Sequence, residues 1–263
     1  MGILNVTPDS FYDGGRHAGL EAALDHGRRL AAEGADLIDV GGESSRPGAR
    51  PVPTDEERER VVPVVAALRA ATDVGISVDT TKADVAAAAL AAGADVVNDI
   101  SAGRFDERML PLVAARGATI ILMHMQGTPA TMQRAPWYAD VLAEVEAFLA
   151  ERARAAVAAG IHPRRIWIDP GIGFGKRREH NLTLLAHLPC LRNLGMPVVV
   201  GASRKRFLAA AGDEAPDDRL AASLAAATFA AAAGASVVRV HDVAATRRAV
   251  AVADALKTAE RTD

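Results

Sequence analysis

The segment VVNDIS, residues 96–101, places an amide and a carboxylate directly after two valines that are typical of a buried strand. Leaving such polar groups buried without a partner costs roughly 2–7 kcal/mol against an apolar reference. Asn98 and Asp99 would point to opposite faces of a strand, so they need different partners. Asn98 is the candidate for contact with a ligand, whereas we expect Asp99 at the surface or at a helix cap.

Other apolar runs also end in residues that can do chemistry. Four segments share a glycine, a small residue and a short apolar run: AAEGADLIDVGG, LAAGADVVNDIS, AARGATIILMHM and AAAGASVVRVHD. The fifth and seventh positions after the glycine face the same way in a strand. These positions and the ends of the other apolar runs carry Asn5, Asp39, Asp79, Asn98, His124, Asp169, Ser203, Lys205, Arg239 and His241. Asp39 and Arg239 could form a structural pair, but so many polar strand ends indicate one site.

The donors and acceptors suit a nitrogen heterocycle that carries phosphate. Asp79 and Asp169 can accept N–H groups, and Asn98 can both donate and accept. Cationic or hydrogen-bonding groups for phosphate are Arg46, Lys205, Arg239 and His241. A zinc site is disfavoured because the two histidines come from different strands without local ligand spacing. A Schiff-base lysine is disfavoured because Lys205 lies between two arginines in an expected loop.

Parallel strands would bring these residues to one face. Eight apolar runs begin near residues 2, 36, 74, 95, 118, 165, 197 and 236. Alanine-rich helical segments include 18–33, 54–71, 82–92, 139–159, 216–233 and 243–257, and TDEE at 54–57 predicts a capping box. Eight βα units predict an α/β fold, a single (β/α)8 TIM barrel domain over residues 1–263, with its site at the carboxyl ends of the strands. The alternative is a doubly wound sheet, but no glycine-rich nucleotide turn follows the first run.

Composition argues against several classes of protein. The 263 residues are 50% hydrophobic and 24% charged, with a net charge of −3, so neither disorder nor a nucleic-acid partner is indicated. No uncharged apolar run reaches the roughly 18 residues of a membrane-spanning helix, and no signal peptide is recognisable. Cys190 is the single cysteine and cannot form an intrachain disulfide. We therefore expect a cytoplasmic protein without nucleic-acid or membrane partners.

The chain also contains, in this order, MGILNVTPDSFYDGG, GGESSRPGA, ISVDTTKADV, VNDIS, LMHMQG, IDPGIGFGK, GASRKRF and RVHDV. Together these motifs resemble the bacterial dihydropteroate synthases, a family of pterin-binding TIM barrels. The resemblance implies condensation of 6-hydroxymethyl-7,8-dihydropterin diphosphate with 4-aminobenzoate, giving 7,8-dihydropteroate and pyrophosphate. It also implies Mg²⁺ as the cofactor, small molecules as the substrates, sulfonamides as inhibitors and a homodimer. Where the family commonly has ESTRPG this chain has ESSRPG, so Ser45 keeps the hydroxyl and lacks a methyl group.

The resemblance further implies roles for individual residues. The pterin would be bound by Asp79, Asn98, Met123, Asp169, Phe174 and Lys205. The diphosphate would be held by Asn5, Arg46, Arg239 and His241, with Asn5 acting through Mg²⁺ and Asp13 as a second candidate. The 4-aminobenzoate would contact Phe11, Ser45, Pro47, Phe174 and Ser203, and Ser203 would open a short helix whose amides take the carboxylate. The catalytic residues would be Asp79, Lys205 and Arg239.

The mechanism and the surface residues complete these expectations. No side chain of the set is a plausible nucleophile, so we expect pyrophosphate to leave before the amine attacks, in an SN1-like order. Two other functions stay open, a module that presents methyltetrahydrofolate to a corrinoid partner and a catalytically silent paralogue. We expect residues 55–60, Lys176 and Arg206 at the surface, and His124 in a supporting position.

Overall fold

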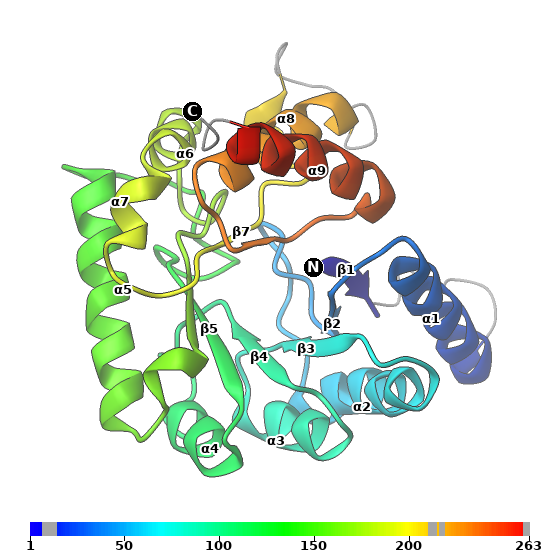
Figure 1. Cartoon of the computed structure of the whole chain (residues 1–263). Coiled ribbons are helices and arrows are strands. Elements are labelled where there is room, and N and C mark those ends of the chain that lie inside the picture. Colours follow the sequence, from blue (N-terminus) through cyan, green and yellow to red (C-terminus); the bar gives the residue numbers. More distant parts are fainter. Residues whose placement is uncertain (7–14, 210–214, 216–218, 260–263) are drawn as a thin grey trace.

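The computed structural model describes residues 1–6, 15–209, 215 and 219–259 of the chain. Within them, eight strands are β1 (Gly2–Asn5), β2 (Leu37–Gly41), β3 (Gly75–Asp79), β4 (Val96–Asp99), β5 (Thr119–Met123), β6 (Ile166–Asp169), β7 (Val199–Val200) and β8 (Val237–Val238). Strands β1 to β6 form one parallel sheet in chain order, and β7 pairs with β8. Parallel bridges join Ile168 to Val198 and Gly2 to Val240. These bridges close the strands into the predicted (β/α)8 barrel, which is confirmed (Figure 1).

Helices surround the strands in Figure 1. They are α1 (Gly15–Ala32), α2 (Thr54–Ala71), α3 (Ala83–Ala91), α4 (Met109–Arg116), α5 (Val141–Ala158), α6 (Arg178–Ala186), α7 (Leu188–Arg192), α8 (Leu220–Ala232) and α9 (Val243–Ala259). Two 3-10 turns are η2 (Pro163–Arg165) and η3 (Arg206–Leu208). The six predicted helical segments correspond to α1, α2, α3, α5, α8 and α9. The repeated glycines follow α1, α3, α4 and α8 with positive φ angles between 59° and 112°, which suits glycine at the end of a helix.

The predicted capping box at the start of α2 is wrong. Pro53 occupies the N-cap position, and no side chain accepts a hydrogen bond from the first turn. The acidic residue of the expected box, Glu57, is only 1% exposed and pairs instead with Lys82, which precedes α3. An ion pair with a distant lysine therefore replaces the local hydrogen bond that the sequence pattern predicts.

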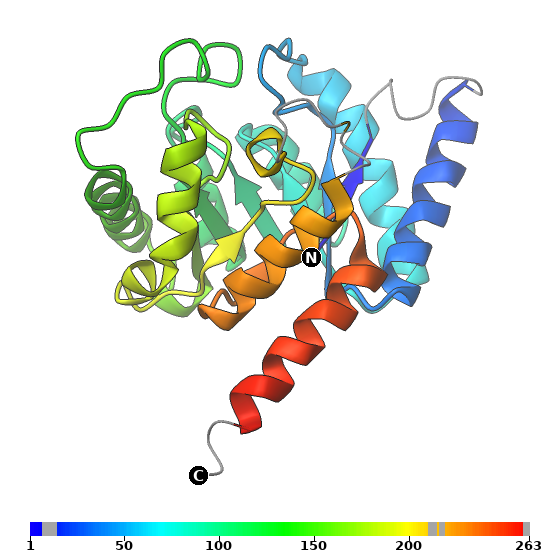
Figure 2. The ribbon, with the colours of Figure 1, turned by 90° about the horizontal axis from the view of Figure 1, so that it is seen from above.

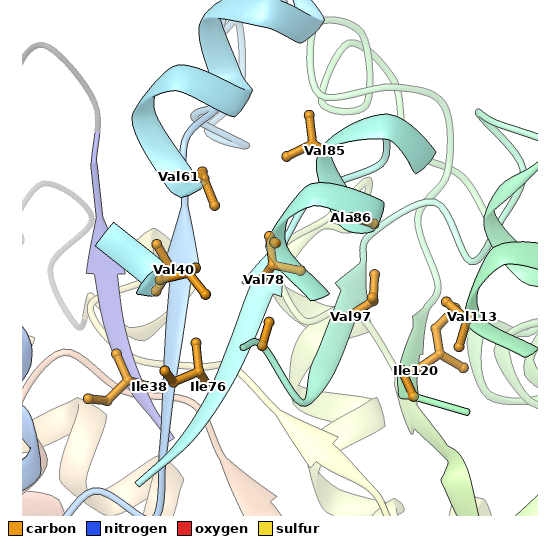
Figure 3. Close-up of a cluster of buried hydrophobic side chains, with 14 of the residues drawn as sticks. Ile38, Val40, Val61, Ile76, Val78, Val85, Ala86, Val97, Val113 and Ile120 are labelled. Carbon is orange, nitrogen blue, oxygen red and sulfur yellow. The ribbon is translucent and has the colours of Figure 1, made fainter. Parts of the chain in front are cut away.

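The main hydrophobic core lies between the strands and the helices that cover them. Figure 3 shows strand residues facing Val61, Val85, Ala86 and Val113 of α2, α3 and α4. The labelled strand residues are Ile38, Val40, Ile76, Val78, Val97 and Ile120, all of them completely buried. These outward-facing positions are apolar, and Asp99 at the end of β4, two residues after Val97, is a buried polar exception on the same face.

The inward face changes from apolar to polar along the strands. One cluster joins the side chains of Met1, Leu37, Val96, Ile121, Trp167, Val199 and Val237. Side chains two residues apart point the same way, so the next inward positions are those of Asp39, Asn98, Met123, Asp169 and Arg239. An apolar layer therefore closes one end of the barrel, and a polar layer lies above it at the carboxyl ends of the strands.

The loops that follow β2 and β5 lie together at this polar end. Figure 2 shows them at the same end of the barrel, whereas the C-terminal part of α9 extends from the other end. Across the residues that the structure describes, no helix is both long and apolar enough to cross a membrane.

Candidate functional site

A buried network of four side chains forms the centre of the polar layer. The Arg239 guanidinium donates from Nε to Asp39 Oδ2 at 2.6 Å and from Nη2 to Asp79 Oδ2 at 2.8 Å. Asn98 Nδ2 donates to the same Asp39 oxygen at 3.1 Å. The pair that Asp39 and Arg239 could form on sequence grounds is therefore present, and it extends to two further strands. It holds Arg239, Asn98 and Asp79 in fixed positions around the barrel axis.

Asp79 lies at the edge between this network and the loops. Its side chain is 12% exposed, and burial raises the pKa of the carboxyl to about 7, although the Arg239 guanidinium acts in the opposite direction. A mostly buried carboxyl group beside a cation can either be protonated or, as a carboxylate, accept a hydrogen bond from an N–H group of a ligand. Arg239 itself is held in its charged form because Asp39 and Asp79 raise its pKa against the effect of burial.

Asp169 and Lys205 form the second part of the site, at the ends of β6 and β7. Asp169 is 6% exposed, and its Oδ1 accepts a hydrogen bond from Gly171 N at 2.6 Å. Burial raises the pKa of this carboxyl, and the nearby Lys205 ammonium opposes the shift. Burial lowers the pKa of Lys205 to about 8, against the effect of Asp169 and with that of Arg239. The two groups are therefore close enough to act on one ligand.

Lys205 is oriented by the segment that follows β6. Its Nζ donates to the Ile172 carbonyl and lies 4.6 Å from the centre of the Phe174 ring, a cation–π distance. A Cβ atom at Gly173 would lie 2.9 Å from Lys205 Cδ, and the backbone there has a φ of +84°. Only glycine at this position lets the lysine cross the segment and reach the polar layer.

An apolar wall borders the polar groups. Met123 is 3% exposed and packs with Ile100, Met125 and Met132, and Phe174 lies partly buried against the same cluster. Met123 of β5 is paired with Asp169 of β6, and Phe174 belongs to the segment that follows Asp169. The structure thus brings together the six residues predicted to bind a flat polar ring.

Ser203 and His241 lie against each other beyond Arg239. Ser203 Oγ is 3.0 Å from His241 Nδ1 and accepts from His241 N at 3.2 Å. Burial lowers the pKa of His241 to about 4, and the positive charges of Arg239 and Arg204 act in the same direction. The ring is therefore neutral at pH 7. The expectation that Ser203 opens a helix is wrong, because η3 begins three residues later, at Arg206. The backbone turns at Arg204 instead, with a φ of +57°.

The loop after β2 brings Ser45, Arg46 and Pro47 to the same end of the barrel. Ser45 is half-buried and lines a small polar cavity together with Asp79 and Thr80. Arg46 and Pro47 are exposed, and the charge of Arg46 contributes to the lowered pKa of His241. Ser45 and Arg46 are therefore close to the polar layer. Phe11 and Asp13 lie outside the described residues.

Asn5 ends β1 and is exposed at the rim. A Cβ atom placed on Gly41 would lie 3.8 Å both from Asn5 Oδ1 and from Asp79 Oδ2, so the missing side chain leaves open space between them. An amide oxygen is a hard ligand of the kind that Mg²⁺ accepts, and this ion usually completes its coordination with water and phosphate oxygens. The position and chemistry of Asn5 therefore fit a magnesium ion.

Three residues expected at the surface are buried, namely Lys176, Asp99 and, in the segment 55–60, Glu57. Lys176 is 3% exposed, and its Nζ lies 2.8 Å from His124 Nδ1, 3.0 Å from Gly171 O and 3.1 Å from Phe174 O. Burial lowers the pKa of Lys176 well below its usual value. Asp99 is fully buried and accepts from Ser101 N and Gly103 N, both at 2.7 Å. Both predictions for Asp99, a surface position or a helix cap, are thus wrong, because the side chain is buried and accepts from the amides of a turn.

Known protein families provide an independent comparison for this arrangement. The family model described as "Pterin binding enzyme" matches residues 1–241. The chain belongs to the pterin-binding enzyme family. The matched residues include every strand of the barrel, from β1 to β8.

Relatives of known name agree with the family assignment. The chain is 47% identical over 257 residues to the dihydropteroate synthase of Synechocystis sp., covering 97% of this chain and 89% of that one. The solved structure of Xanthomonas albilineans dihydropteroate synthase with 4-aminobenzoic acid matches with a TM-score of 0.92 and 53% identity, over 98% of this chain and 92% of that one. The Yersinia pestis dihydropteroate synthase with a sulfonamide drug complex matches with a TM-score of 0.93 and 46% identity, over 98% and 94%. The resemblance to dihydropteroate synthases is confirmed, as is the expectation of a transferase that acts on small molecules.

Proposed function

We propose that this member of the pterin-binding enzyme family condenses 6-hydroxymethyl-7,8-dihydropterin diphosphate with 4-aminobenzoate, giving 7,8-dihydropteroate and pyrophosphate. The observation that carries the proposal is the buried polar layer beside an apolar wall. Asp169, Asn98 and Asp79 offer oxygen acceptors there, and Lys205 offers a donor. This pattern of donors and acceptors is complementary to the edge of a pterin ring.

Asp169 has the main role in recognising the pterin. Its carboxylate would accept hydrogen bonds from the 2-amino group and from N3–H, which are adjacent donors on the pterin ring. Asn98 and Asp79 would contact the rest of the ring edge, and Lys205 would donate to the ring acceptors. Met123 and Phe174 would contact the ring itself, because they form the apolar wall next to Asp169.

The diphosphate would lie above Asp79, between Arg239 and the loop after β2. Arg239, Arg46 and the neutral His241 would donate to its oxygens, and Asn5 would reach it through Mg²⁺. When bound, this ion would supply positive charge that offsets the charge of the leaving group. Arg239 is well suited to the task because Asp39 and Asp79 already hold its guanidinium in place.

The 4-aminobenzoate would occupy the space next to Ser203 and the loop after β2. The backbone amides of Arg204 and Lys205 already donate to Ser223 Oγ at 2.8 Å and to Ala202 O at 3.3 Å. The substrate carboxylate would therefore be received by the Ser203 hydroxyl instead of a helix N-terminus. Ser45, Pro47, Phe174 and Phe11 would frame the aniline ring.

The reaction would proceed in an SN1-like order. The bond between the pterin methylene carbon and the diphosphate oxygen would break first, and its electron pair would leave with pyrophosphate. Preorganised charge at Arg46 and Arg239 would stabilise the leaving group. The carboxylate of Asp79 and the pterin nitrogens would stabilise the cation on the methylene carbon, and Lys205 would keep the ring in place. The lone pair of the neutral amine would then form the new bond to the methylene carbon, and the resulting ammonium would lose one proton to the released pyrophosphate.

A coupled assay for pyrophosphate release tests the proposal. We expect release that requires both substrates and Mg²⁺, together with a product that carries the aminobenzoate group. Methyl transfer to a corrinoid acceptor without pyrophosphate release would instead identify the module that presents methyltetrahydrofolate. Pterin binding without turnover would identify a silent paralogue.

Three broader proposals concern the whole chain. Residues 1–263 would form one domain, because the hydrogen bond from Met1 N to Val238 O at 3.1 Å joins the start of the chain to β8, the last strand of the barrel. The protein would act as a homodimer in the cytoplasm, with small molecules as its substrates and neither nucleic acid nor membrane as a partner. Light scattering of the purified protein would measure the oligomeric state.

A further inference from the structure

An ion network lies at the base of the loop that follows β2. Glu43, the second residue of this loop, accepts from Val52 N with its Oε2 atom at 3.0 Å. A single carboxylate therefore joins the two ends of a ten-residue segment, residues 43–52. Lys82 Nζ donates to the same Glu43 oxygen at 2.5 Å, so the lysine holds the carboxylate that closes the loop.

The other partner of Lys82 is a buried carboxylate on α2. Glu57 is 1% exposed, whereas the side chains of Lys82 and Glu43 are 22% and 25% exposed. Lys82 Nζ donates to Glu57 Oε2, and within the described ranges Glu57 Oε1 has no hydrogen-bond partner. Lys82 is thus the cation that permits the burial of Glu57, and Glu57 in turn fixes the position of the ammonium group.

The start of the loop packs directly on α2. A Cβ atom on Gly42 would lie 2.7 Å from Val61 Cγ2 and 3.0 Å from Glu57 Cγ, and Arg60 Nη1 donates to Gly42 O at 2.8 Å. A movement of Glu57 would therefore move the first residues of the loop. The tip has a different support, a hydrogen bond from Gly48 N to Pro129 O at 3.1 Å.

The network is connected to the site through the cavity under the loop. Glu43, Glu57, Ser45 and Asp79 line this one small polar cavity. Ser45 comes only two residues after Glu43, and Arg46 and Pro47 follow it. The position of Glu43 therefore decides where these residues stand relative to Asp79.

We propose that Lys82 is a positioning residue, which anchors the loop after β2 through Glu43 and Glu57 and thereby shapes the side of the site that receives 4-aminobenzoate. Lys82 would not touch either substrate. The inference rests on the proposed function for the identity of the substrate, whereas the anchoring itself follows from the contacts of the network.

Kinetics of Lys82→Met for each substrate separately form the first test. We expect KM for 4-aminobenzoate to rise about tenfold and KM for the pterin diphosphate to rise less, by at most about threefold. Arg46 is the single proposed diphosphate residue on this loop, and the proposed pterin residues lie on β3 to β6 and in the segments after β6 and β7. Lys82→Arg should restore most of the 4-aminobenzoate KM. Arg108→Met is the matched control, because Arg108 makes ion pairs with Asp84 and Asp106 while 60% exposed, and it should leave both KM values unchanged.

A double variant separates positioning from a purely structural role. Lys82→Met leaves Glu57 buried without a cation, so the single variant should lose thermal stability. Glu57→Gln combined with Lys82→Met removes that charge and should recover most of the stability, while KM for 4-aminobenzoate stays high because Glu43 is still not anchored. Recovery of KM together with stability, or equal changes in both KM values, would overturn the proposal.

Hydrogen exchange provides a readout that does not depend on activity. In Lys82→Met the amides of residues 43–52 should exchange faster than in the native chain, and those of β4 and β6 should not change. Unchanged exchange in this segment would overturn the proposal even in an active enzyme. If the native chain released no pyrophosphate, the proposed function would fail, and the exchange result would still decide whether Lys82 anchors the loop.

Discussion

Replacing Arg239 by methionine tests whether the central network behaves as the structure indicates. Arg239 donates to Asp39 Oδ2 at 2.6 Å and to Asp79 Oδ2 at 2.8 Å, and its own side chain is 20% exposed. Asp39 is fully buried, and among the described residues its other hydrogen-bond donor is the Asn98 amide at 3.1 Å. In the variant, Asp39 would remain in the barrel interior with one neutral donor and without a cation.

The expected cost is large because a buried charge would lose its partner. Removing one member of a buried ion pair typically costs about 3–5 kcal/mol. The partial exposure of Arg239 places this site toward the lower end, since water can reach part of the gap. At about 2–4 °C per kcal/mol for a chain of this size, the melting temperature should fall by roughly 6–15 °C.

Thermal unfolding followed by circular dichroism, without ligands, measures this effect. Asp39→Asn combined with Arg239→Met should recover most of the loss, because the charge that lost its partner is also removed. Arg247→Met is the control, since Arg247 lies 3.3 Å from Asp36 in a pair whose side chains are 58% and 86% exposed. An exposed pair contributes about 0–1 kcal/mol. The reasoning would be refuted if Arg239→Met cost no more than the control, or if the double variant were no more stable than the single one.

Four further predictions concern ligands. Asp169→Asn should weaken pterin binding by roughly 10-fold to 150-fold, the equivalent of about 1.5–3 kcal/mol for a hydrogen bond to a charged group, and calorimetry giving an unchanged affinity would contradict the assignment. Because the pKa of Lys205 is lowered to about 8, pterin affinity should fall as the pH rises through that value, and this decrease should be missing in Lys205→Met. Sulfonamides should compete with 4-aminobenzoate, and noncompetitive inhibition would argue against a shared pocket. Substitutions at Ser45 or Pro47 should weaken the binding of the drug more than the binding of the substrate. Finally, 4-aminobenzoate should bind the free protein weakly and much more tightly with Mg²⁺ and pyrophosphate present. Equal affinities in the two titrations would exclude a 4-aminobenzoate pocket that forms only around bound pyrophosphate.

The sequence alone was enough to predict the eight strands, the helices α1, α2, α3, α5, α8 and α9, and the polar positions at the strand ends. The period of two along each strand places Asp39, Asn98 and Asp169 two residues beyond Leu37, Val96 and Trp167, which pack together inside the barrel. The repeated glycines mark the ends of helices that precede strands, and all of them have positive φ angles. These features depend on neighbouring residues in the chain, so local pattern is enough to predict them.

Only the tertiary structure decided how the charged side chains are paired. Lys176 meets His124 from 52 residues away, and Lys82 meets Glu57 from 25 residues away. The surface position predicted for Lys176 and the local cap predicted at Glu57 were therefore both wrong. The same holds for Ser203, whose nearest polar partner is His241, 38 residues further along the chain. A charged side chain is buried only where a partner offsets its loss of hydration. When that partner is distant in the chain, the local spacing of residues cannot predict it.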